Sequence, residues 1–290
     1  MKPLLVIGSR GQLAQAIRHF RPNAIFLERS IADLSHPHKL TEILEQYDPY
    51  AVINAAAYTS VDNAESEESL ATIVNSQSPA AMAIYCARRH IPFVHLSTDY
   101  VFNGSGDIPW REDDSPEPLN AYGRSKLAGE DAIARVGGKY LIFRTSWVYD
   151  AEGRNFLNSI LRLASEREEL RIINDQFGAP TYARHLARAI LMIVDAALKL
   201  PKFPSGIYNM CNKGVTSWYG FAIEIVQYAR DLDLPVKVRH ILPIPTTEYP
   251  LPAKRPHNSR LDCSKIKSTF DITMPSWQEG LTACMELKKK

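Results

Sequence analysis

Short apolar runs alternate with segments of helical periodicity along the first half of the chain. Short apolar runs predict buried strands, and apolar residues that recur every three or four positions predict amphipathic helices. Strands that alternate with helices indicate βαβ units, so we expect an α/β fold of the Rossmann type, with a doubly wound parallel sheet. The predicted strands are residues 3–7, 24–27, 51–53, 93–96 and 140–143, and the predicted helices are residues 12–20, 39–46, 70–89 and 120–135.

The second half has a different pattern. Its helical segments are residues 154–167, 182–198 and 218–230, with short strand candidates at residues 170–173 and 207–210. Residues 242–258 are so rich in proline that a helix is excluded, and they predict a rigid surface loop. We therefore predict a Rossmann domain over residues 1–150 and a smaller α/β lobe over residues 151–290, from which some segments return to the Rossmann core.

Composition and charge narrow the class of protein. The chain has 290 residues, 45% of them hydrophobic, and a net charge of +2, so no global field attracts nucleic acid or a membrane surface. No apolar run approaches the length that spans a bilayer. The four cysteines are widely separated and no histidines have ligand spacing, which argues against a disulfide framework or a metal site and fits a reducing cytoplasm.

A glycine-containing turn follows the first predicted strand and opens the first predicted helix. The seven residues from Gly8 to Ala14 have the spacing G-x-x-G-x-x-A, with Gly11 as the second glycine. Such glycines let the backbone approach a pyrophosphate, and the helix N-terminus offers unpaired N–H groups and a partial positive charge. An ordinary strand–turn–helix is the alternative, but the place of the turn on the first strand favours dinucleotide binding.

The end of the second predicted strand carries conflicting signals for the cofactor. Glu28 lies about twenty residues after the first glycine, where a carboxylate binds the adenosine ribose of NADH. Arg29 and Arg10 suit the 2′-phosphate of NADPH instead. Asp33, followed by Leu34, precedes the next helix, where Asp33 either contacts the adenine or serves the turn. We therefore predict that either NADPH or NADH is used.

Small residues follow the third predicted strand. Ala55, Ala56 and Ala57 let the backbone pass close beside a bound cofactor at the carboxyl end of a parallel strand, where ligands of open α/β sheets bind. Alanine packing in the core is the alternative. The topological position favours the cofactor.

A tyrosine and a lysine lie four residues apart at the start of the predicted helix 120–135. Tyr122 and Lys126 therefore share one helix face, where the ammonium can lower the pKa of the phenol and prepare it for proton transfer. Alone this spacing is weak. Thr98, at the carboxyl end of the fourth predicted strand, adds a hydroxyl that can donate a hydrogen bond to a carbonyl oxygen as negative charge develops.

These segments together resemble the extended short-chain dehydrogenase/reductase family, and within it the dTDP-4-dehydrorhamnose reductases. The resemblance covers residues 8–262, nearly the whole chain. An ordered series of this length is far more specific than any single motif. Its blocks read GQLA, VDNAE, STDYVFNGSGDIPW, YGRSKLAGE, FRTSWVY, INDQFGAPT and RPHNSRLD.

The resemblance implies reduction of the C4 ketone of dTDP-4-dehydro-β-L-rhamnose by NADPH or NADH, the final step in making dTDP-β-L-rhamnose. It implies that Tyr122 protonates the developing alkoxide, that Lys126 also binds the nicotinamide ribose, and that Thr98 bonds the substrate oxygen. Backbone groups of Gly11, Gln12 and Leu13 would hold the pyrophosphate. The implied contacts with the sugar nucleotide are Asp99, Trp147, Arg255 and Asn258.

Two other classes of protein with different functions have similar sequences. Nucleotide-sugar epimerases and dehydratases use the same Tyr–Lys pair, but often carry Thr-Asp-Glu, whereas Tyr100 follows Asp99 here. Regulatory subunits of methionine adenosyltransferase are similar but non-catalytic, and the intact Thr98, Tyr122 and Lys126 argue against that role.

Some members of the resembled family form dimers bridged by Mg²⁺ through carboxylates. The corresponding helical segments here present Gln15, Arg184 and Arg188, and cations repel Mg²⁺. We therefore expect no metal in the protein, and a monomer or a weak homodimer that is not bridged by metal.

Overall fold

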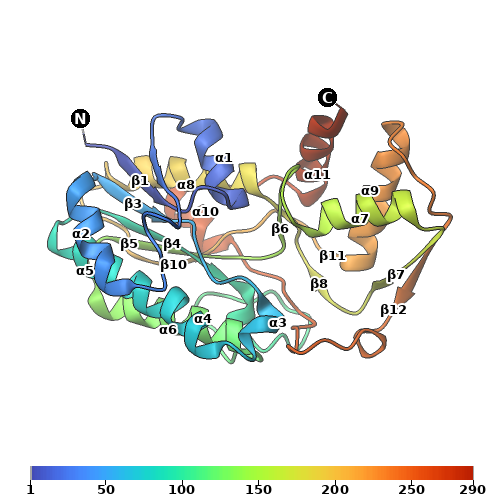
Figure 1. Cartoon of the computed structure of the whole chain (residues 1–290), viewed down its shortest axis with the longest axis horizontal. Helices are drawn as coiled ribbons and strands as arrows, with labels where there is room; N and C mark the ends of the chain where they lie inside the picture. The colour runs from blue at the N-terminus through green and yellow to red at the C-terminus, as the bar shows by residue number, and fades with distance from the viewer. Residues whose placement is uncertain (1, 290) are drawn as a thin grey trace.

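The computed structural model describes residues 2–289 and has two lobes (Figure 1). The larger lobe is built on a six-stranded sheet with the order β10-β5-β4-β3-β1-β2. All neighbouring strands in it are parallel, which confirms the predicted Rossmann-type sheet. Its strands are β1 (Leu4–Ile7), β2 (Ile25–Leu27), β3 (Ala51–Asn54), β4 (Phe93–Thr98), β5 (Tyr140–Thr145) and β10 (Gly206–Asn209).

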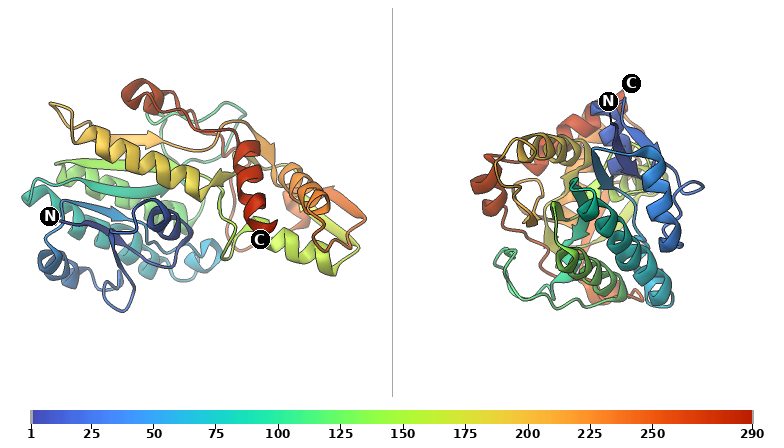
Figure 2. Two further views of the ribbon diagram at one scale, coloured as in Figure 1. Left: turned by 90° about the horizontal axis from the view of Figure 1, so that it is seen from above. Right: turned by 90° about the vertical axis from the view of Figure 1, so that its left-hand side faces the viewer.

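Helices cover both faces of this sheet (Figure 2). Buried apolar residues of α1, α8 and α10 pack on one face, and those of α2, α5 and α6 pack on the other. Strand β10 and helices α8 and α10 come from the second half of the chain but complete the body that the first half begins. The helices are α1 (Gln12–Phe20), α2 (Pro37–Tyr47), α5 (Ser78–Arg88), α6 (Ala121–Val136), α8 (Ala183–Ala197) and α10 (Ser264–Phe270).

The helix predicted over residues 70–89 is a composite of three pieces. Helix α4 (Glu68–Thr72) continues through a π-helical turn, η1 (Ile73–Gln77), into α5, and a short α3 (Val61–Ala64) precedes it. The buried Asn75 side chain lies in the π turn, where it bonds both backbone groups of Tyr58 and the Ser125 hydroxyl. Tertiary contacts therefore define the irregular turn, which apolar periodicity does not reveal.

The smaller lobe packs α7 (Phe156–Glu166), α9 (Trp218–Asp231) and α11 (Trp277–Glu286) around a separate apolar core. Ser217 caps α9, and Ser276 with Glu279 forms a capping box on α11. The remaining elements are β6 (Val148–Tyr149), β7 (Glu169–Ile173), β8 (Phe177–Gly178), β9 (Thr181–Tyr182), β11 (Thr216–Ser217), β12 (His240–Ile244), η2 (Asp99–Val101), η3 (Thr246–Glu248) and η4 (Leu287–Lys289).

The proline-rich segment differs in part from its prediction as a loop. Its first residues belong to β12, which pairs in parallel with β7 and includes Pro243. The two strands form a sheet of their own, so Pro243 lies on an edge strand, where a missing N–H is tolerated. The rest of the segment crosses back toward the larger lobe.

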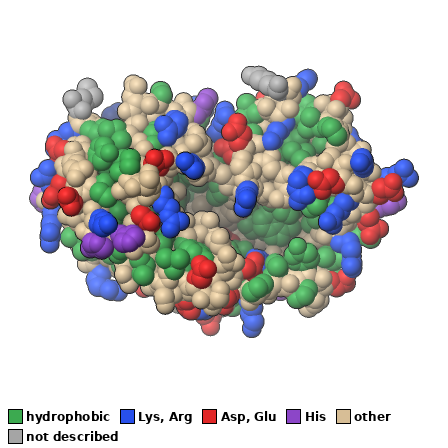
Figure 3. Space-filling model, in the orientation of Figure 1, with side chains coloured by type: hydrophobic (Ala, Val, Ile, Leu, Met, Phe, Trp, Pro, Cys, Tyr) green, Lys and Arg blue, Asp and Glu red, His purple; other side chains and the backbone are tan. Residues whose placement is uncertain are grey.

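The carboxyl ends of β4 and β5 lie at the junction of the two lobes. Figure 3 shows a hollow there, with apolar side chains inside it and Lys or Arg side chains at its margin. Among the described residues, no helix is both long enough and apolar enough to cross a bilayer.

Candidate functional site

The glycine turn after β1 is shaped by close backbone packing. Gly8 has φ +97°, and a Cβ added to it would lie 3.2 Å from the Cβ of Ala56. Gly11 is the N-cap of α1 and offers no side-chain cap, and the first turn carries no acidic residue. The first N–H groups of α1, which include those of Gln12 and Leu13, therefore have no capping side chain. This arrangement fits a pyrophosphate.

Acidic and basic side chains meet at the end of β2. Arg10 Nη2 lies 3.8 Å from Glu28 Oε2, with 90% of the Arg10 side chain exposed. Glu28 accepts a hydrogen bond from the Ser30 hydroxyl at 2.8 Å, and Arg29 Nε lies 3.4 Å from an Asp33 oxygen. The structure therefore keeps groups suited to a ribose hydroxyl and groups suited to a 2′-phosphate at one edge.

Asp33 serves the turn that precedes α2. Its carboxylate accepts from the Ser35 backbone N–H and hydroxyl, both at 2.9 Å, and the backbone bond contributes most to lowering the Asp33 pKa. Leu34 is buried in the core below this turn. These contacts match the turn role, which was one of the two alternatives for Asp33.

The alanine segment after β3 lies directly against the glycine turn. The Ala55 N–H donates to the Ile7 carbonyl at 3.0 Å, and the Ala56 N–H donates to the Asn54 side-chain oxygen at 3.2 Å. Ala55, Ala56 and Ala57 are half-buried. Atoms of Ala55 and Ala56 lie within 4 Å of Cβ atoms added at Gly8 and Gly11, so the segment packs directly on the turn.

The carboxyl end of β4 brings Thr98, Asp99 and Tyr122 together. The Thr98 hydroxyl donates to Asp99 Oδ1 at 3.1 Å and accepts from the Tyr100 N–H at 3.1 Å. Burial raises the pKa of Asp99 to about 7. Burial and then the Asp99 charge raise the pKa of Tyr122 to about 12, while the Thr98 hydroxyl acts in the opposite direction.

Lys126 points into the protein beneath this edge. Its Nζ donates to the Leu96 carbonyl and lies 3.0 Å from His95 Nε2, and burial lowers the Lys126 pKa to about 7. We expected Lys126 to lower the pKa of Tyr122, and the structure does not show this effect. Burial and Asp99 dominate at the phenol, and the lysine nitrogen is turned toward β4.

Local contacts fix the start of α6 against the site. Asn120 caps the helix by accepting from the Gly123 N–H at 2.8 Å. A Cβ on Gly123 would lie 2.2 Å from the Tyr100 carbonyl oxygen, so only glycine lets the helix approach η2 this closely. Further along α6, Glu130 forms a buried ion pair with Arg144 of β5. These contacts hold the start of α6, which carries Tyr122 and Lys126, against the carboxyl end of β4.

Trp147 follows β5 with φ +50°, a conformation rare for a large side chain. Its ring stacks on Trp218 with centroids 3.6 Å apart, and Trp218 Nε1 donates to Gln176 Oε1. The indole pair therefore joins the end of β5 to the start of α9 at the junction of the lobes. Sequence reasoning missed Trp218, although its place after the Thr216–Ser217 helix start was visible.

Arg255 and Asn258 are occupied by contacts within the protein. Arg255 forms a two-pronged ion pair with Asp62 of α3, at 2.7 and 2.9 Å. The buried Asn258 donates to the Ile108 carbonyl at 2.8 Å and accepts from Arg260 Nη1 at 3.0 Å. As the structure stands, both residues join loops, which explains their presence without a ligand.

Three buried polar atoms near the reacting edge have no partner among the described residues. They are Ser97 Oγ, Asp99 Oδ2 and Thr145 Oγ1. Thr98 and Thr145 are aligned on the neighbouring strands β4 and β5. Unpaired buried polar atoms are costly, so their grouping here indicates a place for polar ligand groups. Thr145 was not predicted; its signal is a hydroxyl at the carboxyl end of the fifth strand.

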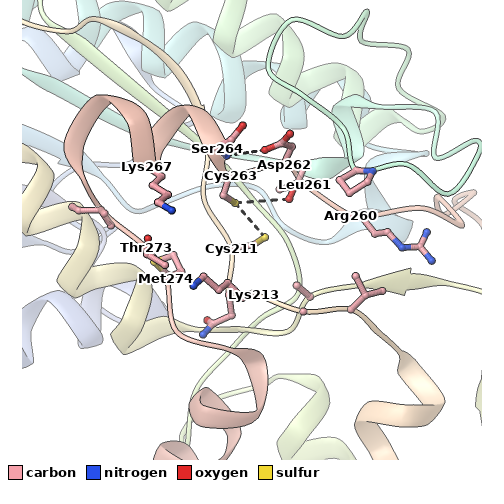
Figure 4. A pocket seen from close by; sticks show the side chains of 16 residues that line it. Cys211, Lys213, Arg260, Leu261, Asp262, Cys263, Ser264, Lys267, Thr273 and Met274 are labelled. Atoms are coloured by element: carbon pink, nitrogen blue, oxygen red, sulfur yellow. Dashed lines mark hydrogen bonds between the residues drawn. The ribbon is translucent and has the colours of Figure 1, made fainter.

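A separate cavity of about 370 Å³ lies between the segment that follows β10 and the residues in and around α10 (Figure 4). Its lining includes Lys213, Arg260 and Lys267, and the thiols of Cys211 and Cys263 lie 3.7 Å apart beside it. Among the described residues that line it, none was predicted to bind a cofactor or to act in catalysis. The residues predicted to act in catalysis, Thr98, Tyr122 and Lys126, do not line this cavity.

Comparison with known proteins gives a consistent family. The model of the RmlD substrate binding domain matches residues 1–289. The chain is 44% identical to a dTDP-4-dehydrorhamnose reductase of Burkholderia thailandensis, with 97% of each chain covered. It is 41% identical to the enzyme of Salmonella typhimurium, with 96% of this chain and 95% of the other covered.

Solved structures agree. A dTDP-4-dehydrorhamnose reductase from Bacillus anthracis in complex with NADP superposes with a TM-score of 0.91 at 32% identity, covering 99% of this chain and 100% of the other. A UDP-glucose 4-epimerase from Thermotoga maritima has a TM-score of 0.80 at 18% identity, covering 99% of this chain and 98% of the other, and shares the fold alone. The chain therefore belongs to the dTDP-4-dehydrorhamnose reductase family.

Proposed function

We propose that this protein reduces the C4 ketone of dTDP-4-dehydro-β-L-rhamnose to dTDP-β-L-rhamnose, with NADPH or NADH as the reductant. The observation that carries this proposal is the contact of Tyr122 with Thr98 at the carboxyl end of β4, on the same edge of the parallel sheet as the glycine turn after β1. The Lys126 nitrogen bonds the Leu96 carbonyl of the same strand. The length and identity of the match to reductases of this name supply the substrate.

The cofactor fits residues of the larger lobe. The N–H groups at the start of α1, with Gly8, Gly11, Gln12 and Leu13, would hold the pyrophosphate. Ala55 to Ala57 would line the adjoining path. Glu28 with Arg10 and Arg29 would face the adenosine ribose, and their mixed charge supports use of both nucleotides.

The chain's own groups manage the proton and the developing charge. NADPH or NADH, when bound, would supply the hydride. Thr98 holds the substrate oxygen, and Tyr122 donates a proton to it as the carbonyl becomes an alcohol. With a pKa of about 12, Tyr122 is a protonated phenol at neutral pH, which is the form a proton donor needs. Lys126 lies on the same helix face and would bind the ribose hydroxyls once its nitrogen turns from the Leu96 carbonyl and His95.

The sugar nucleotide would occupy the junction of the lobes. Asp99, with one unpartnered oxygen, and Thr145 would bond sugar hydroxyls. The Trp147 face would contact the apolar part of the sugar nucleotide. Arg255 and Asn258 would take part only if their present bonds to Asp62 and Ile108 exchange for bonds to the ligand.

We also propose a monomer or weak homodimer without a bridging metal, acting in the cytoplasm. Gln15 of α1 donates to the Ser9 carbonyl, and α8 carries the half-buried Arg184 and the exposed Arg188 in place of carboxylates. Sedimentation with and without EDTA tests this, since a chelator-sensitive dimer contradicts it.

The decisive experiment follows NADPH absorbance with the enzymatically made dTDP-4-keto sugar, and with its UDP analogue as the control. Stoichiometric NADPH oxidation with the dTDP sugar supports the proposal. An epimerase or dehydratase would instead retain nucleotide after purification and consume no NADPH. A regulatory subunit would show no oxidation and would bind a methionine adenosyltransferase.

A further inference from the structure

A buried row of polar side chains runs from Lys126 under the sheet edge. Lys126 Nζ lies 3.0 Å from His95 Nε2, and His95 Nδ1 lies 3.1 Å from Asn54 Nδ2. All three side chains are buried, with 1% of each residue exposed. Asn54 and His95 are aligned partners on β3 and β4, so their side chains point to the same face of the sheet.

The backbone of the cofactor-lining segment fixes the direction of this row. The Ala56 N–H donates to Asn54 Oδ1 at 3.2 Å. Turning the Asn54 amide over would place its NH₂ against this N–H, with two donors facing each other. The amide nitrogen of Asn54 therefore faces His95 Nδ1 and donates to it.

This direction determines which ring nitrogen of His95 carries the proton. A neutral imidazole has one donor and one acceptor nitrogen, so Nδ1, which accepts from Asn54, leaves the proton on Nε2. Complete burial, the largest cause, lowers the pKa of His95 well below its usual value and so favours the neutral ring. Nε2–H therefore points at the lysine nitrogen, and only an amine, not an ammonium, can accept it.

The surroundings of Lys126 agree with this arrangement. Burial is the main cause that lowers its pKa to about 7, and Glu130 acts in the opposite direction. Glu130 is itself held by Arg144. The titratable groups on the elements that pack against α6 are His95 on β4, Asp99 and Tyr100 on η2, Asp62 on α3, Glu68 on α4, Tyr140 and Arg144 on β5, and Tyr85, Cys86 and Arg88 on α5.

We propose that His95, oriented by Asn54, is a positioning residue that presents its Nε2–H to Lys126 and so controls how readily Lys126 holds the proton that supports Tyr122. This rests on the proposed roles of Tyr122 and Lys126. Reduction adds a hydride and a proton to the ketone, and the proton leaves Tyr122. The phenolate must regain a proton before the next cycle, and a lysine that exchanges protons near neutral pH serves this step.

The same row couples catalysis to the cofactor. Asn54 bonds Ala56 with its oxygen and His95 with its nitrogen, so the alanine segment and the lysine are two ends of one hydrogen-bonded row. A shift of that segment on cofactor binding therefore changes the partner that His95 offers to Lys126.

The test measures the pH dependence of kcat for reduction, which should fall as Lys126 loses its proton. In His95→Gln the amide oxygen can accept from an ammonium, and in Asn54→Leu the ring is free to place its proton on Nδ1 and accept at Nε2. Both changes favour the charged lysine. We expect the fall of kcat at alkaline pH (the alkaline limb) to begin about one pH unit higher in each variant than in the wild type.

Ser125→Ala is the matched control, because Ser125 is buried on α6 beside Lys126 and bonds Asn75. It should lower the melting temperature without moving the limb. An unmoved limb in both folded variants overturns the inference, while loss of rate in Tyr122→Phe still upholds the proposed function. Should the variants fail to fold, ¹⁵N spectra of histidine in the wild-type protein decide: a His95 proton on Nε2 supports the inference, and one on Nδ1 overturns it.

Discussion

Several buried polar groups at the carboxyl end of β4 lack hydrogen-bond partners, whereas those of Arg255 and Asn258 are paired within the protein. At the edge, Asp99 Oδ2 and Thr145 Oγ1 are buried without a partner, and the pKa values of Asp99 and Lys126 are both displaced toward neutrality by burial. In the other segment, Arg255 and Asn258 satisfy their groups within the protein. Unsatisfied polar groups indicate chemistry, and satisfied ones indicate architecture.

The largest effect should come from Tyr122→Phe, which keeps the ring and removes the proton donor. Turnover should fall by about a hundredfold or more, as measured by NADPH oxidation. Tyr140→Phe, at the amino end of β5, is the control and should keep its turnover. Near-normal turnover in Tyr122→Phe would place the chemistry elsewhere.

Asp99→Asn should remove a cost of folding at the reacting edge. The folded-state pKa of about 7 lies above the usual value of 3.8, so the Asp99 contribution to stability is full below pH 4 and is lost as pH rises to 7. The variant should therefore gain on the wild type across that window, by about 1.4 kcal/mol per pH unit at most. Denaturant unfolding at several pH values measures the difference, and a constant difference would contradict the burial argument.

Asn258→Ala should destabilise the protein, because the Asn258 side chain is paired within the segment around Arg255 and Asn258. It leaves the Ile108 carbonyl and the Arg260 guanidinium without their partner, so the free energy of unfolding should fall by about 2 kcal/mol. The exposed Gln227→Ala on α9 should change it little. A large rise in KM for the sugar nucleotide with unchanged stability would instead make Asn258 a ligand contact.

Gly8→Ala should weaken NADPH binding by about tenfold, because strain at positive φ costs on the order of 1–3 kcal/mol and the new methyl presses on Ala56. Gly106→Ala is a matched control, since Gly106 also has positive φ but nothing lies within 4 Å of its added Cβ. It should lose stability while keeping its NADPH affinity in a fluorescence titration. Equal affinity for NADPH in both variants would show that the glycine turn is not part of the cofactor site.

Local patterns were enough for most strands of the larger lobe and for its first helix. The strands from β1 to β5 and the helix α1 lie where apolar runs and periodicity predict them, because each buries a continuous apolar stripe. The secondary structure of residues 70–89 and 242–258 was harder to predict from the sequence. Asn75 creates the π turn through a distant partner, and Pro243 is accepted in β12 because that strand lies at an edge.

The sequence by itself determined the sheet type, the glycine turn, and the Tyr122–Lys126 pair on one helix face, because spacing within one element is a local property. Only the tertiary structure decided which groups face each other. It joined Asn54, His95 and Lys126 from three elements, and it stacked Trp147 on Trp218 across the lobes. Burial at that edge, which no spacing reports, set the pKa values of Asp99, Tyr122 and Lys126.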